Sequence, residues 1–406
     1  MPVTYRETFL PNGLRVAAEV DPGAHTSAVG VFVRTGARDE PAELMGVSHF
    51  LEHMMFKGSA TRTATEVNDA FNAIGADANA FTSSEMTAYH AHSLPEQLER
   101  STCLVLDLLR PALRQADFDE EKGVILEEIA MYDDNPFWVV YERAIEAYYS
   151  GHPLSHRVLG TRESIASLSR DQMHGYFSSR YSPGSSVLVA AGSVDFDALV
   201  ALAQRETSAW AGAGQRRVLT PHRPEPSRFR HAMEKATRGY MVMLWPSVPS
   251  TDPARYAASL CAHILGDSGG SRLHWSLVEP GIAEEAEAGF DGRDGSGECI
   301  VSVACEVDAL DRAEEIVRRQ CAALPASITD DDLTRAKAKI ATGVALGGER
   351  PAGRMRRLGG VLTTRGTYMA LEDEMAAIEA LTVRDLRDHI EAYPFEPVVI
   401  GCAVPA

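Results

Sequence analysis

The sequence predicts an α+β fold in which two homologous domains, each a mixed α/β sheet with packed helices, arise from an internal duplication. Strand and helix patterns alternate along the first third of the chain, as is typical of such domains. Towards the end of each half, an Ile-x-x-Leu segment precedes a helical pattern and a buried strand. The segment begins at Ile165 and again at Ile378, an offset of 213 residues. Because a helix followed by a strand is common, a chance match is the alternative.

The individual elements follow from hydrophobic periodicity and from the residues that punctuate it. Strand patterns, rich in β-branched residues or apolar throughout, occupy residues 16–20, 27–34, 76–90, 187–191 and 239–244. Helical patterns occupy residues 41–57, 64–74, 95–113 and 117–131. The first of these helices has Pro41 in its first turn and Gly58 at its end, the positions that these two residues favour.

A change of composition separates the two halves. Residues 205–236 contain Ala-Gly-Ala-Gly at 211–214, followed by three prolines among basic residues, which is typical of a linker. We therefore expect an N-terminal domain at 1–212, a linker at 213–236 and a homologous C-terminal domain at 237–406.

Composition disfavours several classes of protein. The formal net charge of -18 argues against binding to nucleic acid, which needs clustered basic residues. No apolar run approaches the ~20 residues of a membrane span, and residues 1–6 lack the pattern of a secretory signal, so we expect no membrane partner. The six cysteines form no CxxC pair, and we expect reduced core thiols in a cytoplasmic protein.

One short motif carries metal chemistry. His49 and His53 are four residues apart in a predicted helix, so they lie about 40° apart on one face, which Glu52 shares. The opposite face is apolar, with Leu44, Val47, Leu51, Met54 and Met55. Two neutral imidazoles at this spacing suit Zn²⁺, and Glu52 can take a proton from a metal-activated water and pass it to a leaving amine. The alternative is a histidine pair on an amphipathic helix that binds no metal.

The motif stands within a longer block, Gly46–Gly58, that resembles the core block of the inverzincin peptidases pitrilysin, insulysin and mitochondrial processing peptidase. Later residues resemble the other blocks of that family: Gly75, Asn79-Ala80-Phe81-Thr82, Glu85, Thr87, Tyr89, Glu121–Ile129, His152-Pro153-Leu154 and Val158–Thr161. The resemblance covers the first half of the chain and, more weakly, the second half.

The resemblance implies one Zn²⁺ per chain with a third ligand on the helix 117–131. Glu128 aligns with that ligand, and Glu121 aligns with an acidic residue that assists the site. Glu121 and Glu128 share a helix face, but Glu120 and Glu127 do so equally, so spacing alone leaves both pairs open. Val124-Ile125 aligns with an apolar pair of the family, and this alignment favours Glu121 and Glu128.

The resemblance also implies how a substrate binds. Asn79, Ala80, Phe81 and Thr82 align with an edge strand on which the family lays an extended peptide. The free N–H and C=O groups of an edge strand accept an added strand with little demand on its sequence. The length resembles the short bacterial and mitochondrial branch, in which two-domain chains face each other as a clamshell. One chain is then half of a chamber, and a dimer acts on unstructured peptides or presequences.

The second half departs from the family pattern at one place. Many active relatives carry an Arg and a Tyr, seven apart, after a Ser-Arg-Leu block, to contact substrate and stabilise the reacting carbonyl. Here Leu277 or Val278 stands at the Arg position, and Glu284, which would repel an oxyanion, stands at the Tyr position. A homologous partner in a heterodimer would supply the pair, or a homodimer would use other groups. The alternative is a non-catalytic subunit that binds zinc or peptide.

Overall fold

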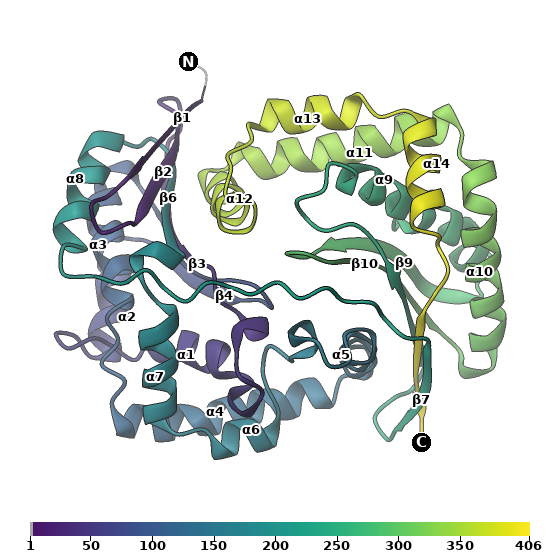
Figure 1. Ribbon diagram of the computed structural model, residues 1–406, viewed down its shortest axis with the longest axis horizontal. Helices are drawn as coiled ribbons and strands as arrows, with labels where there is room; N and C mark the ends of the chain where they lie inside the picture. The colour runs from purple at the N-terminus through teal and green to yellow at the C-terminus, as the bar shows by residue number, and fades with distance from the viewer. Residues whose placement is uncertain (1–2) are drawn as a thin grey trace. The chain divides into compact units, whose positions relative to one another are not determined.

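The computed structural model describes residues 3–406, and the chain forms two compact units. Unit 1 consists of the chain up to Ile129 together with His156–Val218 and Leu346–Met369. Unit 2 consists of Ala130–Ser155, Leu219–Ala345 and Ala370–Ala406. Each unit is a sheet with helices packed on it (Figure 1).

Unit 1 is built on a six-stranded sheet. Its strands are β1 Thr4–Phe9, β2 Arg15–Val20, β3 Ser27–Val33, β4 Asp77–Thr82, β5 Thr87–Ser93 and β6 Ser186–Gly192. Their order across the sheet is β1-β2-β6-β3-β5-β4, with β2 and β6 parallel and all other neighbours antiparallel. Within the described residues 3–406, β4 pairs with β5 alone, so it forms an edge of this sheet.

Unit 2 is built on a five-stranded sheet. Its strands are β7 Ser227–Met233, β8 Gly239–Pro246, β9 Ala283–Gly292, β10 Gly297–Cys305 and β11 Val399–Pro405. Their order is β7-β11-β8-β10-β9, with β7 and β11 parallel and the other neighbours antiparallel.

The two sheets share one topology, which confirms the predicted duplication. The run β2-β6-β3-β5-β4 and the run β7-β11-β8-β10-β9 have the same order and the same parallel and antiparallel pairings. The offset of 213 residues also holds, since β6 begins at Ser186 and β11 at Val399. The helices that precede these strands begin at equivalent caps, where the Ser169 and Thr382 hydroxyls accept from the third helical N–H.

Helices pack on both sheets. Those of unit 1 are α1 Val47–Met55, α2 Ala64–Ala73, α3 Leu98–Leu108, most of α4 Gln115–Asp133, α6 Arg162–Ser167, α7 Arg170–Arg180, α8 Phe196–Glu206 and α12 Pro351–Thr364. Those of unit 2 are α5 Pro136–Tyr148, α9 Arg255–Gly266, α10 Leu310–Ser327, most of α11 Asp330–Glu349, α13 Leu371–Glu379 and α14 Val383–Ala392.

The two units exchange one helix each. α5, which follows α4, packs on β8 and β11 of unit 2, while α12, which follows α11, packs on β3 and β6 of unit 1. The continuous ranges 1–212 and 237–406 do not describe this exchange, because an amphipathic pattern reveals a buried face but not the sheet that covers it. Residues 211–226 carry no helix or strand, and β7 begins inside the range 213–236 expected for the linker.

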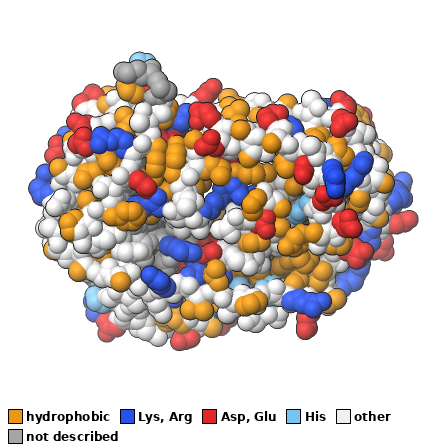
Figure 2. All heavy atoms as spheres, turned by 45° about the horizontal axis from the view of Figure 1, so that its top comes forward, with side chains coloured by type: hydrophobic (Ala, Val, Ile, Leu, Met, Phe, Trp, Pro, Cys, Tyr) orange, Lys and Arg blue, Asp and Glu red, His pale blue; other side chains and the backbone are white. Residues whose placement is uncertain are grey.

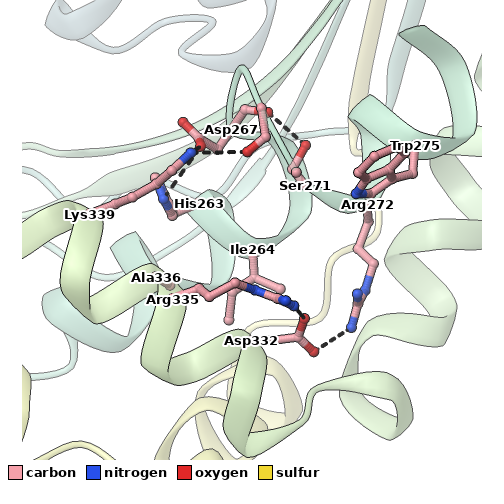
Figure 3. A pocket seen from close by; sticks show the side chains of 12 residues that line it. His263, Ile264, Asp267, Ser271, Arg272, Trp275, Asp332, Arg335, Ala336 and Lys339 are labelled. Atoms are coloured by element: carbon pink, nitrogen blue, oxygen red, sulfur yellow. Dashed lines mark hydrogen bonds and ion pairs between the residues drawn. The ribbon is translucent and has the colours of Figure 1, made fainter. Parts of the chain in front are cut away.

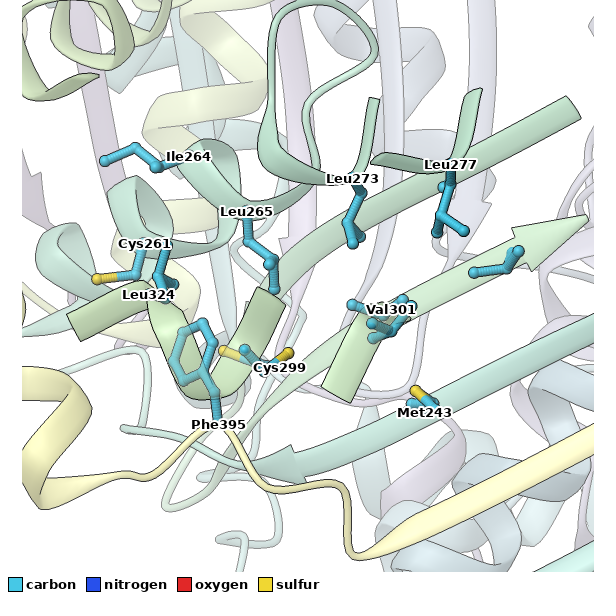
Figure 4. Close-up of a cluster of buried hydrophobic side chains, with 14 of the residues drawn as sticks. Met243, Cys261, Ile264, Leu265, Leu273, Leu277, Cys299, Val301, Leu324 and Phe395 are labelled. Carbon is cyan, nitrogen blue, oxygen red and sulfur yellow. The ribbon is translucent and has the colours of Figure 1, made fainter. Parts of the chain in front are cut away.

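Each sheet buries an apolar core. In unit 2, side chains of β10 such as Cys299 and Val301 pack with Leu265 of α9 (Figure 4). All six cysteines are free, as expected, and five of them are buried. Cys103 is the half-buried exception.

The first predicted helix is shorter than its pattern. α1 begins at Val47 and not at Pro41, because Gly46 has a φ of 91°, a left-handed conformation that breaks the helix. A Cβ at this glycine would lie 2.6 Å from the carbonyl oxygen of Leu159. The strand pattern over 76–90 is divided in the structure, because this segment forms β4, a tight turn and the start of β5.

The helices and the charged side chains of the surface relate to two classes of partner, membranes and nucleic acid. No helix within residues 3–406 combines the length and the apolar character that crossing a membrane requires. On the face that Figure 2 presents, acidic and basic side chains are interspersed and do not gather by sign.

The packing of α12 on β3 gives a test of the fold. A Cβ at Gly359 would lie 2.2 Å from the buried ring of Phe32, whereas a Cβ at Gly360 would meet nothing within 4 Å. We expect Gly359→Ala to lower the free energy of unfolding by about 1–3 kcal/mol through overpacking. Gly360→Ala should leave it unchanged or raise it by up to ~1 kcal/mol, since alanine favours a helix. Urea denaturation of both variants makes the comparison, and equal effects would contradict this packing.

Candidate metal centre and active site

α1 has a buried face and a polar face, as its sequence predicted. The buried face consists of Val47, Phe50, Leu51, Met54 and Met55. His49, Glu52 and His53 are only partly buried. The ring centroids of His49 and His53 are 4.7 Å apart, so both imidazoles occupy one side of the helix.

A carboxylate from α4 joins the two imidazoles. Nε2 of His49 and Nε2 of His53 each lie 3.8 Å from Oε2 of Glu128. The three ligand atoms lie within 4.8 Å of one another, and no second group of this kind occurs within residues 3–406. Ligand atoms at about 2.1 Å from a tetrahedral Zn²⁺ are about 3.4 Å apart, so a small contraction would let this group hold zinc.

The structure separates the two carboxylate pairs that spacing alone left open. Glu120 and Glu127 are exposed, whereas Glu121 is buried, with Oε1 at 2.8 Å from Nδ1 of His53. A carboxylate can only accept, so Nδ1 donates, and the other ring nitrogen, Nε2, is the atom that could bind a metal. Burial alone would raise the pKa of Glu121, but an ion pair with Lys57 and the bond to His53 outweigh it and hold that pKa below its usual range.

Glu52 is tied to the edge strand of unit 1. The hydroxyl of Thr82, the last residue of β4, donates to Oε2 of Glu52 at 2.7 Å. α1 also packs against β4 along this contact. The sequence placed Thr82 on the expected substrate strand but gave no sign of its bond to Glu52.

The structure places the four expected substrate-binding residues on an edge. Asn79 is exposed, and Ala80, Phe81 and Thr82 are partly buried on β4. Strand alternation puts Asn79 and Phe81 on one face of the sheet and Ala80 and Thr82 on the face of Glu52. The ring of Phe81 packs edge-on against Phe32, at 6.2 Å between centroids.

Burial sets the protonation of the site. It lowers the pKa of His49 to about 4, with the neighbouring His53 adding to the effect, so His49 is neutral at pH 7 and has a lone pair for a metal. Nδ1 of His49 is buried and has no hydrogen-bond partner within residues 3–406. Burial also raises the pKa values of Glu52 and Glu128 above those of ordinary carboxyls.

Glu40 holds the start of α1, and sequence reasoning missed it. Its buried carboxyl group accepts from the backbone N–H groups of Gly46 at 2.6 Å and Ser48 at 2.7 Å. Burial raises its pKa to about 8. Glu40 lies too far before the helix to match a capping pattern, so only the folded chain reveals its role.

Unit 2 contains a charged pocket of different character, formed by α9, α11 and the turn after α9 (Figure 3). Asp267 forms an ion pair with Lys339. Asp332 forms ion pairs with Arg272 at 2.6 Å and Arg335 at 3.1 Å. Each of these carboxylates already has a cationic partner, so the pocket is a network of ion pairs. It therefore differs from the group of potential metal ligands on α1 and α4.

The two positions that depart from the family pattern both lie in unit 2. Leu277 is fully buried in the core shown in Figure 4, and Val278 packs against that core. Glu284, on β9, forms an ion pair with Arg238 at 2.6 Å. These positions therefore offer a substrate neither a guanidinium nor a phenol.

Known proteins resemble the chain over most of its length. Residues 15–162 match the family model for insulinase (peptidase family M16), and residues 167–340 match that for the peptidase M16 inactive domain. A Mycobacterium leprae protein named as an uncharacterized zinc protease is 33% identical over 392 residues, which are 93% of this chain and 87% of that protein. The mitochondrial-processing peptidase subunit beta of Caenorhabditis elegans is 30% identical over 393 residues, 94% of this chain and 85% of that subunit.

A solved structure supports the same assignment at the level of the fold. The crystal structure of a peptidase M16 inactive domain from Pseudomonas fluorescens superposes with a TM-score of 0.92 at 19% identity, covering 100% of this chain and 98% of that one. The chain therefore belongs to the insulinase family of peptidases, peptidase family M16, and to its short two-domain branch.

Proposed function

We propose that this chain is a zinc metalloendopeptidase that cleaves unstructured peptides or presequences, in the cytoplasm and as the catalytic subunit of a dimer. One observation carries the proposal: the ligand atoms of His49, His53 and Glu128 lie within 4.8 Å of one another. Beside them stands Glu52, a carboxylate fixed by Thr82 of an edge strand. Relatives named as zinc proteases support the class of enzyme.

In this proposal His49, His53 and Glu128 hold one zinc ion, and Glu121 orients His53 through Nδ1. Bound zinc would lower the pKa of a water towards 7 and polarise the carbonyl of a peptide bond. Two nitrogen donors and one carboxylate would hold the metal and would leave room for a water molecule beside it.

Glu52 is the proposed general base. Its carboxylate shares the helix face of both imidazoles, yet it is no member of the group of three ligand atoms. Burial raises the pKa of Glu52, which brings it closer to the working pH of a group that takes a proton and then gives it up. The bond from Thr82 to Oε2 leaves Oε1 to accept the proton of an attacking water.

The substrate strand in this proposal adds to β4, beside Asn79, Ala80, Phe81 and Thr82. The edge of β4 away from β5 pairs with no strand within residues 3–406. Main-chain hydrogen bonds to that edge would hold an extended peptide whatever its sequence, which favours unfolded chains over folded proteins.

We propose a partner subunit because unit 2 has neither the Arg nor the Tyr of the family pattern at the corresponding positions. Leu277 is buried, and Glu284 is acidic and paired with Arg238. A heterodimer with a homologous subunit would supply the Arg/Tyr pair, and a homodimer would use other groups. One relative is itself named as a subunit, the beta subunit of mitochondrial-processing peptidase. The second candidate function, favoured by the same buried Leu277, is a subunit that binds zinc or peptide without cleaving.

The first test concerns Glu52. We expect Glu52→Gln to keep its zinc but to lower kcat by at least ~10²-fold, because an amide cannot take the proton. Glu127→Gln, on the exposed face of α4, is the matched control and should retain full activity. Peptide hydrolysis together with metal analysis checks both variants, and near-normal turnover by Glu52→Gln would refute the assigned role.

The second test concerns the metal. At a free zinc concentration of 100 times Kd, binding stabilises a folded protein by about 2.7 kcal/mol. We therefore expect zinc to raise the Tm of the metal-free wild-type chain and of Glu127→Gln. The same zinc concentration should have little effect on His53→Ala or Glu128→Gln. If Glu128→Gln binds zinc as tightly as the wild type, Glu128 is not a ligand.

The third test separates the oligomeric alternatives. We expect this chain alone to cleave a mixed library of unstructured peptides weakly, in a reaction that a zinc chelator abolishes. Addition of a homologous chain that carries the Arg/Tyr pair should raise the rate by about 10²-fold, the effect of one restored oxyanion contact. No gain over the chain alone would reject the heterodimer. Bound zinc with no cleavage in either sample would favour the binding-only function.

A further inference from the structure

Arg217 lies in the segment without helix or strand, yet its side chain is only 4% exposed. Its Nε donates to Oδ1 of Asp39 at 3.0 Å and its Nη2 donates to Oδ2 at 2.6 Å, which is a two-point contact between guanidinium and carboxylate. Nη2 also donates to the backbone oxygen of Glu85 at 2.6 Å, and Nη1 lies 3.5 Å from Oε1 of the same residue. Arg217 therefore binds two acidic residues that are far apart in the sequence.

The two acidic residues belong to segments that touch. Asp39 ends the short 3₁₀ helix Ala37–Asp39, and Glu85 lies in the turn between β4 and β5. The backbone N–H of Ala37 donates to the oxygen of Ser83 at 3.1 Å. Next to this bond, Arg38 forms an ion pair with Glu85. The segments are close enough that a Cβ at Gly36 would lie 2.4 Å from the oxygen of Ser83.

Each of these segments leads directly into the candidate active site. Asp39 precedes Glu40, whose carboxyl group accepts from the first N–H groups of α1. The turn that contains Glu85 directly follows Thr82, which donates to Glu52. Arg217 thus joins the segment that fixes the start of α1 to the segment that ends the expected substrate strand.

We infer that Arg217 is a positioning residue that sets the edge strand β4 at its working distance from Glu52, an inference that rests on the proposed peptidase function. Removal of Arg217 leaves the buried carboxylates of Asp39 and Glu85, 2% and 8% exposed, each with one guanidinium fewer. Buried carboxylates that lose a cation tend to move towards water or another partner. The turn would then shift, and a small shift between a bound peptide and its base strongly lowers the rate.

Arg217→Gln tests the inference in the full-length, zinc-loaded protein. We expect kcat to fall by at least ~10-fold with zinc content unchanged, while KM changes less because β4 keeps its backbone edge. Arg217→Lys keeps the charge without the two-point contact and should recover part of kcat. Arg216→Gln removes the same charge from an exposed neighbour and should behave as the wild type.

A second control separates positioning from general stability. Arg354→Gln breaks a contact of 3.1 Å to the buried Glu19 on β2, outside the β4–β5 hairpin. This variant should lower Tm without lowering kcat. If Arg217→Gln also lowers only Tm, or if Arg216→Gln loses as much kcat, the positioning role is overturned.

Hydrogen exchange tests whether Arg217 holds the two segments together, even if the chain cleaves no peptide. In Arg217→Gln, the amides of Ala37, Arg38 and Ser83, which bond within and between the two segments, should exchange at least ~10-fold faster than in the wild type. Arg354→Gln should leave these amides protected. Unchanged exchange in Arg217→Gln would overturn the inference. If the wild-type chain cleaves no peptide, either alone or with a homologous chain, that result would count against the proposed function alone.

Discussion

The hydrogen bond from Thr82 to Glu52 is the contact on which the proposed chemistry most depends, because it joins a strand to a helix. A peptide added to β4 takes its position from that strand, while the carboxylate that must reach its scissile bond takes its position from α1. The peptide and the carboxylate keep the right distance from each other only while β4 and α1 stay fixed against each other. Well-oriented reacting groups are worth about 7–11 kcal/mol of a barrier, so this small contact has large consequences. Two buried polar groups, Glu40 at the start of α1 and Arg217 beside the turn after β4, brace the same pair of elements.

The exchange of α5 and α12 gives the duplication a physical rationale. Side chains of α12, such as Met355 and Leu358, complete the cluster that buries Phe32 of unit 1. Side chains of α5, such as Val140, do the same over β8 and β11 of unit 2. Each half of the chain therefore relies on a helix from the other half to cover one apolar face of its sheet. Because burial of apolar surface is the main favourable term in folding, the two homologous halves stabilise each other through these helices.

The sequence predicts much of the fold and of the candidate site. The features that it does not predict have one cause in common. The duplication was visible at an offset of 213 residues, because the helix caps and buried strands of both halves are local patterns. The His49–Glu52–His53 face was visible because helix geometry alone sets it. The start of α1 was placed wrongly, since the limit at Gly46 comes from a backbone segment more than a hundred residues away. The destination of α12 and the partners of Glu52 were equally out of reach, since tertiary packing decides them and sequence spacing does not.

Charge distinguishes the group of ligands on α1 and α4 from the charged pocket of unit 2. Around α1, the carboxylates of Glu52, Glu121 and Glu128 gather with one ammonium partner, Lys57. Burial disfavours the charged forms of Glu52 and Glu128 and raises the pKa of each. A divalent cation would stabilise the charged forms of both carboxyl groups, and burial keeps His49 neutral and able to bind it. In the pocket of unit 2, lysine and arginine already neutralise each carboxylate, so a cation there would have to displace an existing ion pair at a cost in desolvation. The duplicated fold thus has a group of potential metal ligands in one unit and carboxylates already held in ion pairs in the other.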